Sequence, residues 1–234
     1  MLLTICLSSF CYIFLVIDHY LRLSGSVKLA VIFKGMASLC FLSLAVYSFI
    51  NCRKKSAKFR RVSVFVLTGI IIAGFADIVL ELNFVMGFVL FMIAQLFYFY
   101  AFSGYGKLKP KFFIYSAILI IILTSVDIAS PLFNFEKDGE NLLFPSIVYM
   151  ISLVVVVVQG SESFKMKDIH AKTMAIGTSL FAWSDFLLEM YVFPSGIFSK
   201  GVLEAIFIFS NLMYYTGQLM VAWSLSKDYC EEQN

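Results

Sequence analysis

Long runs of hydrophobic residues alternate with short polar segments along the whole chain. A transmembrane helix needs roughly 20 apolar residues to cross about 30 Å of hydrocarbon, because an α-helix rises about 1.5 Å per residue. Backbone polar groups in hydrocarbon must be hydrogen-bonded within the protein, so such runs are expected to be helices. We predict eight transmembrane helices, near residues 2–17, 27–50, 62–82, 84–103, 112–128, 142–159, 171–193 and 202–225.

The first hydrophobic run is expected to be a retained helix and not a signal peptide. No Lys or Arg precedes it, and the following "VIDHYLRLSG" lacks a small-residue cleavage site. Four Pro residues, short loops and the lack of a low-complexity segment leave no sign of a linker. The predicted fold is therefore all-α, a single polytopic membrane domain over 1–234 built as an integral bundle of eight helices.

Composition agrees with this class. Hydrophobic residues make up 61% of the chain and charged residues 14%, whereas soluble domains contain about 25% charged residues. The segments "NCRKKSAKFRR", "GYGKLKPK" and "SESFKMKDIHAK", together with the C-terminal tail, contain 13 of the 18 Lys and Arg residues. By the positive-inside rule these segments and both termini are cytoplasmic. The net charge of +3 thus reflects topology and does not indicate a nucleic-acid partner.

Metal and nucleotide sites are not expected. The five cysteines form no CxxC pair, and the chain contains no GxGxxG, Walker-type or HExxH motif. His19 and His170 fall in loops at opposite membrane faces, so they do not suggest a shared metal site. We therefore expect no cofactor.

Two acidic pairs interrupt the hydrophobic runs. The stretches "GFADIVLELNF" and "LFAWSDFLLEMYVF" share the pattern Asp-x-x-Leu-Glu, which gives Asp77 with Glu81 and Asp185 with Glu189. Counted from the cytoplasmic ends of their spans, both aspartates lie at a depth of about 21–22 Å, in the outer half of the bilayer. Charge in hydrocarbon is costly, so the aspartates are candidates for catalysis, although pairing with Lys34 or a neighbouring helix is the structural alternative. The repeat is consistent with two parallel four-helix halves.

Other polar residues in the spans are expected to reach the same level. Lys34 lies about 10 Å from the outer face, near both aspartates. On the fourth and eighth spans, amides and tyrosines follow one another along one helical face. They either form a polar pocket that opens outward or hold helices together. The candidate substrate-binding residues are Lys34, Gln95, Tyr98, Asn211, Tyr215 and Gln218.

Three segments carry a resemblance to a known family. "GFADIVLELNFVMGFVLFMIAQLFYFYAF", "GTSLFAWSDFLLEMYVF" and "NLMYYTGQLMVAWS" resemble motifs of the lysoplasmalogenase-like (YhhN) family of eight-span membrane proteins. The matching residues include the early Lys34, then Asp77, Phe84, Gly87, Phe91, Tyr98, Phe102, Phe181, Ser184, Asp185, Tyr214, Tyr215, Gln218 and Leu219.

The chain departs from the family pattern at three positions. Ala76 replaces the Gly before the first Asp, Gly35 replaces the Pro after the early Lys, and Gln95 replaces a His on the fourth helix. Gln95 cannot titrate, so any proton-transfer role of that His is lost or taken elsewhere.

The resemblance implies hydrolysis of the vinyl ether bond of lysoplasmalogens, with a lipid substrate that enters from the bilayer. Such a reaction needs a proton donor at carbon and an anion near the resulting oxocarbenium ion. Asp77 and Asp185 would share these roles, and the sequence does not say which is the acid. The alternatives are a proton-coupled carrier, a lipid-binding membrane protein, and a scaffold or receptor without chemistry. The oligomeric state is not predicted.

Overall fold

The computed structural model describes residues 2–51, 57–105, 110–129, 133–137, 140–194 and 196–226. Eight residues on which the predictions of topology and of cysteine pairing depend lie outside these ranges: Cys52, Arg53, Lys54, Lys55, Lys107, Lys109, Lys227 and Cys230. Eight long helices occupy most of the described residues: α1 (Leu2–Leu23), α2 (Val27–Asn51), α3 (Ala57–Leu82), α4 (Phe84–Tyr105), α5 (Pro110–Ala129), α6 (Leu143–Ser161), α7 (Ile169–Val192) and α8 (Lys200–Trp223). The short strands β1 (Glu136–Lys137) and β2 (Glu140–Asn141) form an antiparallel hairpin, and η1 (Glu162–Lys165) links α6 to α7.

Seven of these helices are long and apolar enough to cross a membrane, judged by length and composition within the described residues. The eight predicted helices are therefore found, and seven qualify as spans. The exception is α7, in which Lys172, Asp185, Glu189 and several Ser and Thr residues lower the hydropathy. Its role as an eighth span stays a prediction. The helices fit a multi-pass membrane protein.

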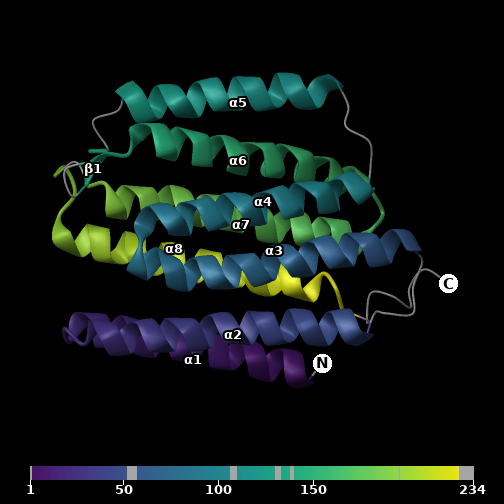
Figure 1. Cartoon of the computed structure of the whole chain (residues 1–234), viewed down its shortest axis with the longest axis horizontal. Coiled ribbons are helices and arrows are strands. Elements are labelled where there is room, and N and C mark those ends of the chain that lie inside the picture. Colours follow the sequence, from purple (N-terminus) through teal and green to yellow (C-terminus); the bar gives the residue numbers. More distant parts are fainter. Residues whose placement is uncertain are drawn as a thin grey trace.

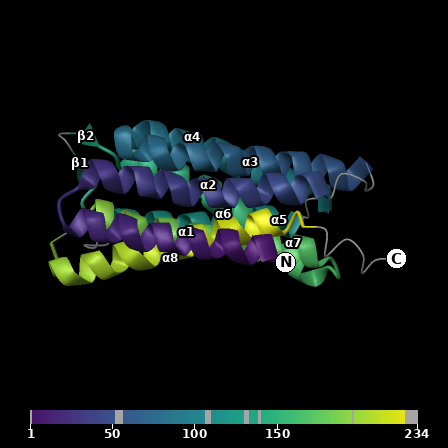
Figure 2. The same ribbon diagram turned by 90° about the horizontal axis from the view of Figure 1, so that it is seen from below.

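The helices form a bundle with two similar halves (Figure 1). The neighbours α1 and α2 lie at one edge, α5 and α6 lie at the other, and α3, α4, α7 and α8 fill the middle. The first half is α1–α4 and the second half is α5–α8. Helix α2 contacts α8, and α6 contacts α4, so the second helix of each half packs against the last helix of the other half. This arrangement agrees with the repeat seen in the sequence. Figure 2 shows that the start of α1 and the end of α8 lie at the same end of the bundle.

The helices α7 and α8 approach each other closely through two glycines. A Cβ atom on Gly177 would lie 2.7 Å from the carbonyl oxygen of Gly217, and one on Gly217 would lie 2.6 Å from that of Gly177. Both contacts are with backbone, which cannot move aside as a side chain can. The lack of a side chain at Gly177 and at Gly217 therefore sets the distance between α7, which carries Asp185, and α8, which carries Tyr215.

A small aromatic cluster closes the end of the bundle that carries β1 and β2. Phe133, Phe135, Leu142 and Phe193 are buried there, with Phe84 and Phe186 packed against them. Backbone hydrogen bonds from Asn134 to Phe193 and from Leu142 to Phe135 fix the loop in place. This cluster lies over the ends of α4, α6 and α7, where the acidic pairs approach the bundle surface.

Candidate functional site

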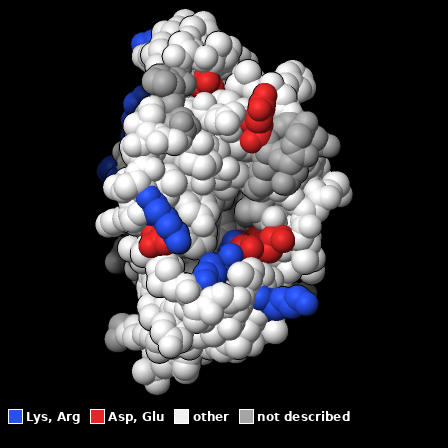
Figure 3. All heavy atoms as spheres, turned by 90° about the vertical axis from the view of Figure 1, so that its left-hand side faces the viewer, with Lys and Arg blue, Asp and Glu red and all other residues white. Residues whose placement is uncertain are grey.

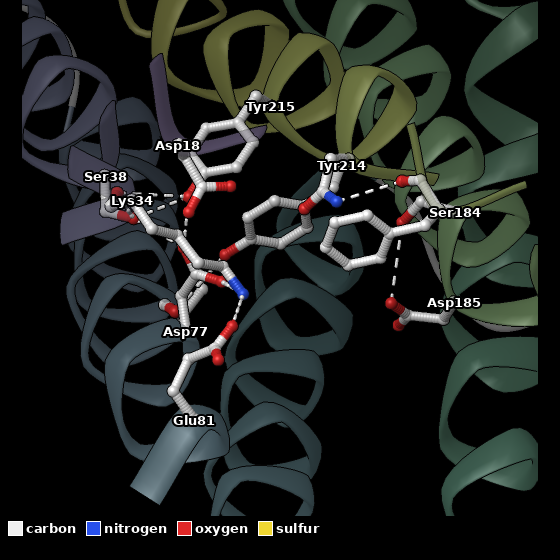
Figure 4. Close-up of polar contacts among 12 residues, drawn as sticks. Asp18, Lys34, Ser38, Asp77, Glu81, Ser184, Asp185, Tyr214 and Tyr215 are labelled. Carbon is white, nitrogen blue, oxygen red and sulfur yellow. Dashed lines mark hydrogen bonds and ion pairs between the residues drawn. The ribbon is translucent and has the colours of Figure 1, made fainter. Parts of the chain in front are cut away.

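A network of ion pairs surrounds Asp77 and Glu81 on α3 (Figure 4). The Lys34 Nζ atom lies 3.1 Å from Asp77 Oδ1 and 2.8 Å from Glu81 Oε1. Arg22 from α1 lies 2.8 Å from Glu81 Oε1 and 3.0 Å from Asp18 Oδ1. Three helices, α1, α2 and α3, thus contribute two basic and three acidic side chains, which we call the ion-pair cluster.

Asp77 accepts bonds from outside the ion-pair cluster as well as from within it. Its Oδ2 atom accepts hydrogen bonds from Ser38 Oγ at 2.6 Å and from the Tyr215 hydroxyl at 2.5 Å, in addition to the Lys34 ion pair. A buried carboxylate is tolerated when its charge is paired and its oxygens are hydrogen-bonded. The expected approach of Lys34 and Tyr215 to Asp77 is therefore found.

Arg22 and Asp18 were not predicted as members of this cluster. The predicted first span ends near residue 17, whereas α1 continues to Leu23 and includes both residues. The Arg22–Asp18 pair, four residues apart on one helical face, offers the signal that was missed. Figure 3 shows the face at this end of the bundle, where basic and acidic side chains meet beside a hollow.

Asp185 lies in a different environment, in a pocket of about 420 Å³ between α3, α4, α5, α6 and α7. The Tyr149 hydroxyl donates a hydrogen bond to Asp185 Oδ2, and the Ser184 hydroxyl lies 3.5 Å from Oδ1. The other pocket residues are Leu80, Phe84, Phe88, Phe91, Leu119, Leu123, Asp127, Ser146, Tyr149, Met150, Leu153, Val154, Val157, Ser179, Ala182, Trp183, Phe186, Leu188, Glu189 and Val192. A cavity of this size and mostly apolar lining suits a lipid chain with a polar group at one end.

Aromatic side chains stand between the ion-pair cluster and this pocket. Tyr214 lies between Asp77 and Asp185 in Figure 4. Its ring centroid is 4.9 Å from that of Tyr215, which binds Asp77, and 5.9 Å from that of Phe91, which lines the pocket. Phe181 packs against both Tyr214 and Phe91. These rings connect the two acidic sites by packing.

The two aspartates therefore occupy separate local environments. Asp185 lines the pocket of about 420 Å³, and Asp77 is not among the described residues that line it. A joint role of both carboxyls on one substrate stays a prediction.

The remaining candidate binding residues lie outside that pocket. The Tyr98 hydroxyl donates to Gln218 Oε1 at 3.0 Å, so these two side chains join α4 to α8. Gln95 is buried on α4, and the Asn211 side chain donates to the carbonyl of Phe207 on its own helix. The structure thus groups Lys34 and Tyr215 with Asp77, pairs Tyr98 with Gln218, and brings neither group into the pocket of Asp185.

Two polar pocket residues, Asp127 and Tyr149, were not predicted from the sequence, whereas Glu189 was already named as part of the second acidic pair. Asp127 stands two residues before the end of α5, outside the two Asp-x-x-Leu-Glu repeats from which the acidic candidates were chosen. Within the described ranges, no three His, Cys, Asp or Glu side chains are arranged to hold a metal ion.

Comparisons with known proteins give one match. The model of the YhhN family matches residues 29–225, which include every helix except α1 and nearly all of the sites described above. No match was found among curated proteins or among solved structures.

Proposed function

The chain belongs to the YhhN family, which includes lysoplasmalogenases, and from this premise we propose that it is a membrane-embedded hydrolase that cleaves the vinyl ether bond of lysoplasmalogens. The products are a long-chain aldehyde and a glycerophospho-amine. The observation that carries the proposal is the position of Asp185, a carboxyl group inside a largely apolar pocket and hydrogen-bonded to a tyrosine.

The proposed acid is Asp185. A carboxyl group without a basic partner is buried at lower cost as the neutral acid than as the anion. Tyr149 donates to Oδ2, and the bond described for Oδ1 is a long contact of 3.5 Å with the Ser184 hydroxyl. Proton transfer from Asp185 to the alkene carbon distant from the ether oxygen gives an oxocarbenium ion.

The same carboxyl group completes the reaction. After the transfer, the Asp185 carboxylate faces the oxocarbenium ion and stabilises its charge. Water then attacks the cationic carbon and returns a proton to Asp185. The hemiacetal that forms breaks down to the aldehyde and the free alcohol, so the cycle consumes one water and regenerates the acid.

In this proposal Asp77 acts indirectly. It fixes the hydroxyl of Tyr215, whose ring packs on Tyr214, and Tyr214 packs on Phe91 in the pocket wall. The ion-pair cluster thereby positions α8 against the pocket. Asp77 already has partners within the protein, an ion pair with Lys34 and hydrogen bonds from Ser38 and Tyr215, and it does not line the pocket among the described residues.

We further propose that α7 crosses the membrane as an eighth span and that both termini are cytoplasmic. The support is the unequal distribution of Lys and Arg and the location of the start of α1 and the end of α8 at one end of the bundle. Cysteine labelling in intact cells should reach a residue introduced in the 129–141 loop from outside. Labelling of that loop from the cytoplasmic side alone would reverse the orientation.

The reaction is tested with purified protein in a non-ionic detergent. Alkenyl-glycerophosphoethanolamine or alkenyl-glycerophosphocholine should release long-chain aldehyde, whereas the acyl ester analogue should remain intact. A carrier would show no aldehyde and would instead move protons or lipid in sealed vesicles, in a manner dependent on Asp185. That pair of results would reject the hydrolase proposal.

A further inference from the structure

The two halves of the bundle carry three acidic residues on equivalent helices. In each half, one acid lies on the first helix near the hairpin end of the bundle, and an Asp and a Glu lie four residues apart on the third helix. The sets are Asp18, Asp77 and Glu81 in the first half and Asp127, Asp185 and Glu189 in the second. The second set lines the pocket of about 420 Å³.

The halves differ in positive charge. In the first half, Arg22 and Lys34 lie 2.8 to 3.1 Å from the carboxylates. In the second half, none of the described residues that line the pocket is a Lys or an Arg. Asp127, Asp185 and Glu189 all line this pocket, so three acids share one cavity whose described wall contains no basic side chain.

Asp127 provides the second, independent observation. It is 6% exposed, and its Oδ2 atom has no hydrogen-bond partner among the described residues. Burying a carboxylate without a partner is costly, so native proteins keep such a group mainly where a ligand or a function requires it. Asp127 is also one of the residues that line the pocket.

We propose that Asp127 and Glu189 bind an organic ammonium group, which supplies the positive charge that Arg22 and Lys34 supply in the first half. Aromatic rings line the same pocket: Phe88 and Tyr149 stack with centroids 4.7 Å apart, and Trp183 is also part of the wall. Such rings attract ammonium groups through their faces.

The pocket also fixes the direction of the ligand. Glu189 lies one helical turn beyond Asp185, towards the hairpin end. Leu153, Val154 and Val157 continue the wall in the opposite direction, along α6. The ligand is therefore an amphiphile with its ammonium group at Asp127 and Glu189 and its alkyl chain along α6. The ammonium belongs either to a lysolipid head group or to a simple long-chain amine; the first source rests on the proposed function and puts the ether bond nearest Asp185.

Direct binding tests the ammonium site without turnover. Purified protein in a non-ionic detergent is titrated with three probes: lysophosphatidylcholine, dodecyltrimethylammonium and amine-free lysophosphatidic acid. The substitutions Asp127→Asn and Glu189→Gln should each weaken binding of an ammonium probe by at least about tenfold, because each removes one charge that faces the cation. Binding of lysophosphatidic acid should be weak and should not fall in either variant.

A matched control is Glu204→Gln, which removes an acid that pairs with Lys200 and does not line the pocket. It should leave the affinity for every probe within about twofold. Asp127→Asn should retain the melting temperature of the parent, because Asp127 Oδ2 has no hydrogen-bond partner among the described residues. Ser146→Lys adds a basic group to the pocket wall and should also weaken binding of the ammonium probes.

The outcomes separate the sources and the two proposals. Sensitivity of lysophosphatidylcholine to the substitutions supports the head-group source, and sensitivity of dodecyltrimethylammonium alone supports a simple amine. Equal affinity of parent, Asp127→Asn and Glu189→Gln for both ammonium probes would overturn the ammonium site. A protein that binds these probes but releases no aldehyde would keep the ammonium site and lose the proposed reaction. A protein that releases aldehyde equally fast from an amine-free alkenyl lipid would keep the proposed reaction and lose the ammonium site.

Discussion

Asp185→Asn is expected to lower the rate of aldehyde release by at least about 100-fold, the usual scale for loss of a general acid. Asn keeps the size of the side chain and still accepts the hydrogen bond from Tyr149, but it has no proton to give. The folded state loses no ion pair, since no basic side chain contacts Asp185 among the described residues. The melting temperature should therefore remain close to that of the parent, and the rate of aldehyde release alone should fall.

Asp77→Asn serves as the comparison for Asp185→Asn. It removes a charged partner from Lys34 and weakens the acceptor of Tyr215, so both the melting temperature and the rate should fall. The two variants therefore differ in stability even where both lose activity. A rate for Asp185→Asn within a few-fold of the parent would remove Asp185 from the chemistry and return the acid role to Asp77.

Lys34→Met is expected to produce the largest loss of stability, about 3 kcal/mol. The change removes the ammonium that lies 3.1 Å from Asp77 and 2.8 Å from Glu81, and leaves Asp77 as a buried charge without a basic partner. Arg22 continues to pair with Glu81, so the loss falls mainly on Asp77. Denaturant titration of the protein in detergent measures the change in the free energy of unfolding.

Lys200→Met is the matched control. Lys200 pairs with Glu204 at 3.9 Å and its side chain is 92% exposed, so its removal should change little. The double variant Lys34→Met with Asp77→Asn should recover part of the lost stability, because the unpaired charge is removed as well. If Lys34→Met is as stable as Lys200→Met, the ion-pair cluster does not hold α1, α2 and α3 together.

The helices and the first acidic site could be predicted because they depend on position along a helix axis. Hydrophobic length gave the helices, and a rise of about 1.5 Å per residue placed Lys34 and Asp77 at one level. Their contact in the structure follows from that shared depth. The length of α1 could not be derived in the same way, since Asp18 and Arg22 interrupt the apolar pattern and their burial depends on Glu81 from another helix.

The pocket around Asp185 was not predictable because depth does not determine the direction in which a side chain points around its helix. Asp185 shares the level of Asp77, yet it bonds to Tyr149 on α6, whereas Asp77 bonds to Tyr215 on α8. That difference comes from helix packing, which brings α7 against α6 and α3 against α8. Asp127 was missed for a related reason. In the sequence it is an acid at the end of a hydrophobic run, and only the structure shows that it is buried in a pocket with residues of α6 and α7.

The origin of the transferred proton tests the central claim most directly. Purified protein is supplied with an alkenyl-glycerophospholipid in deuterated water, and the aldehyde is trapped as it forms and analysed by mass spectrometry. If Asp185 protonates carbon, each aldehyde carries one deuterium on the carbon next to the carbonyl, and Asp185→Asn yields almost none of this product. Aldehyde without deuterium at that carbon would contradict the account. The release of no aldehyde by the folded parent protein would also contradict it.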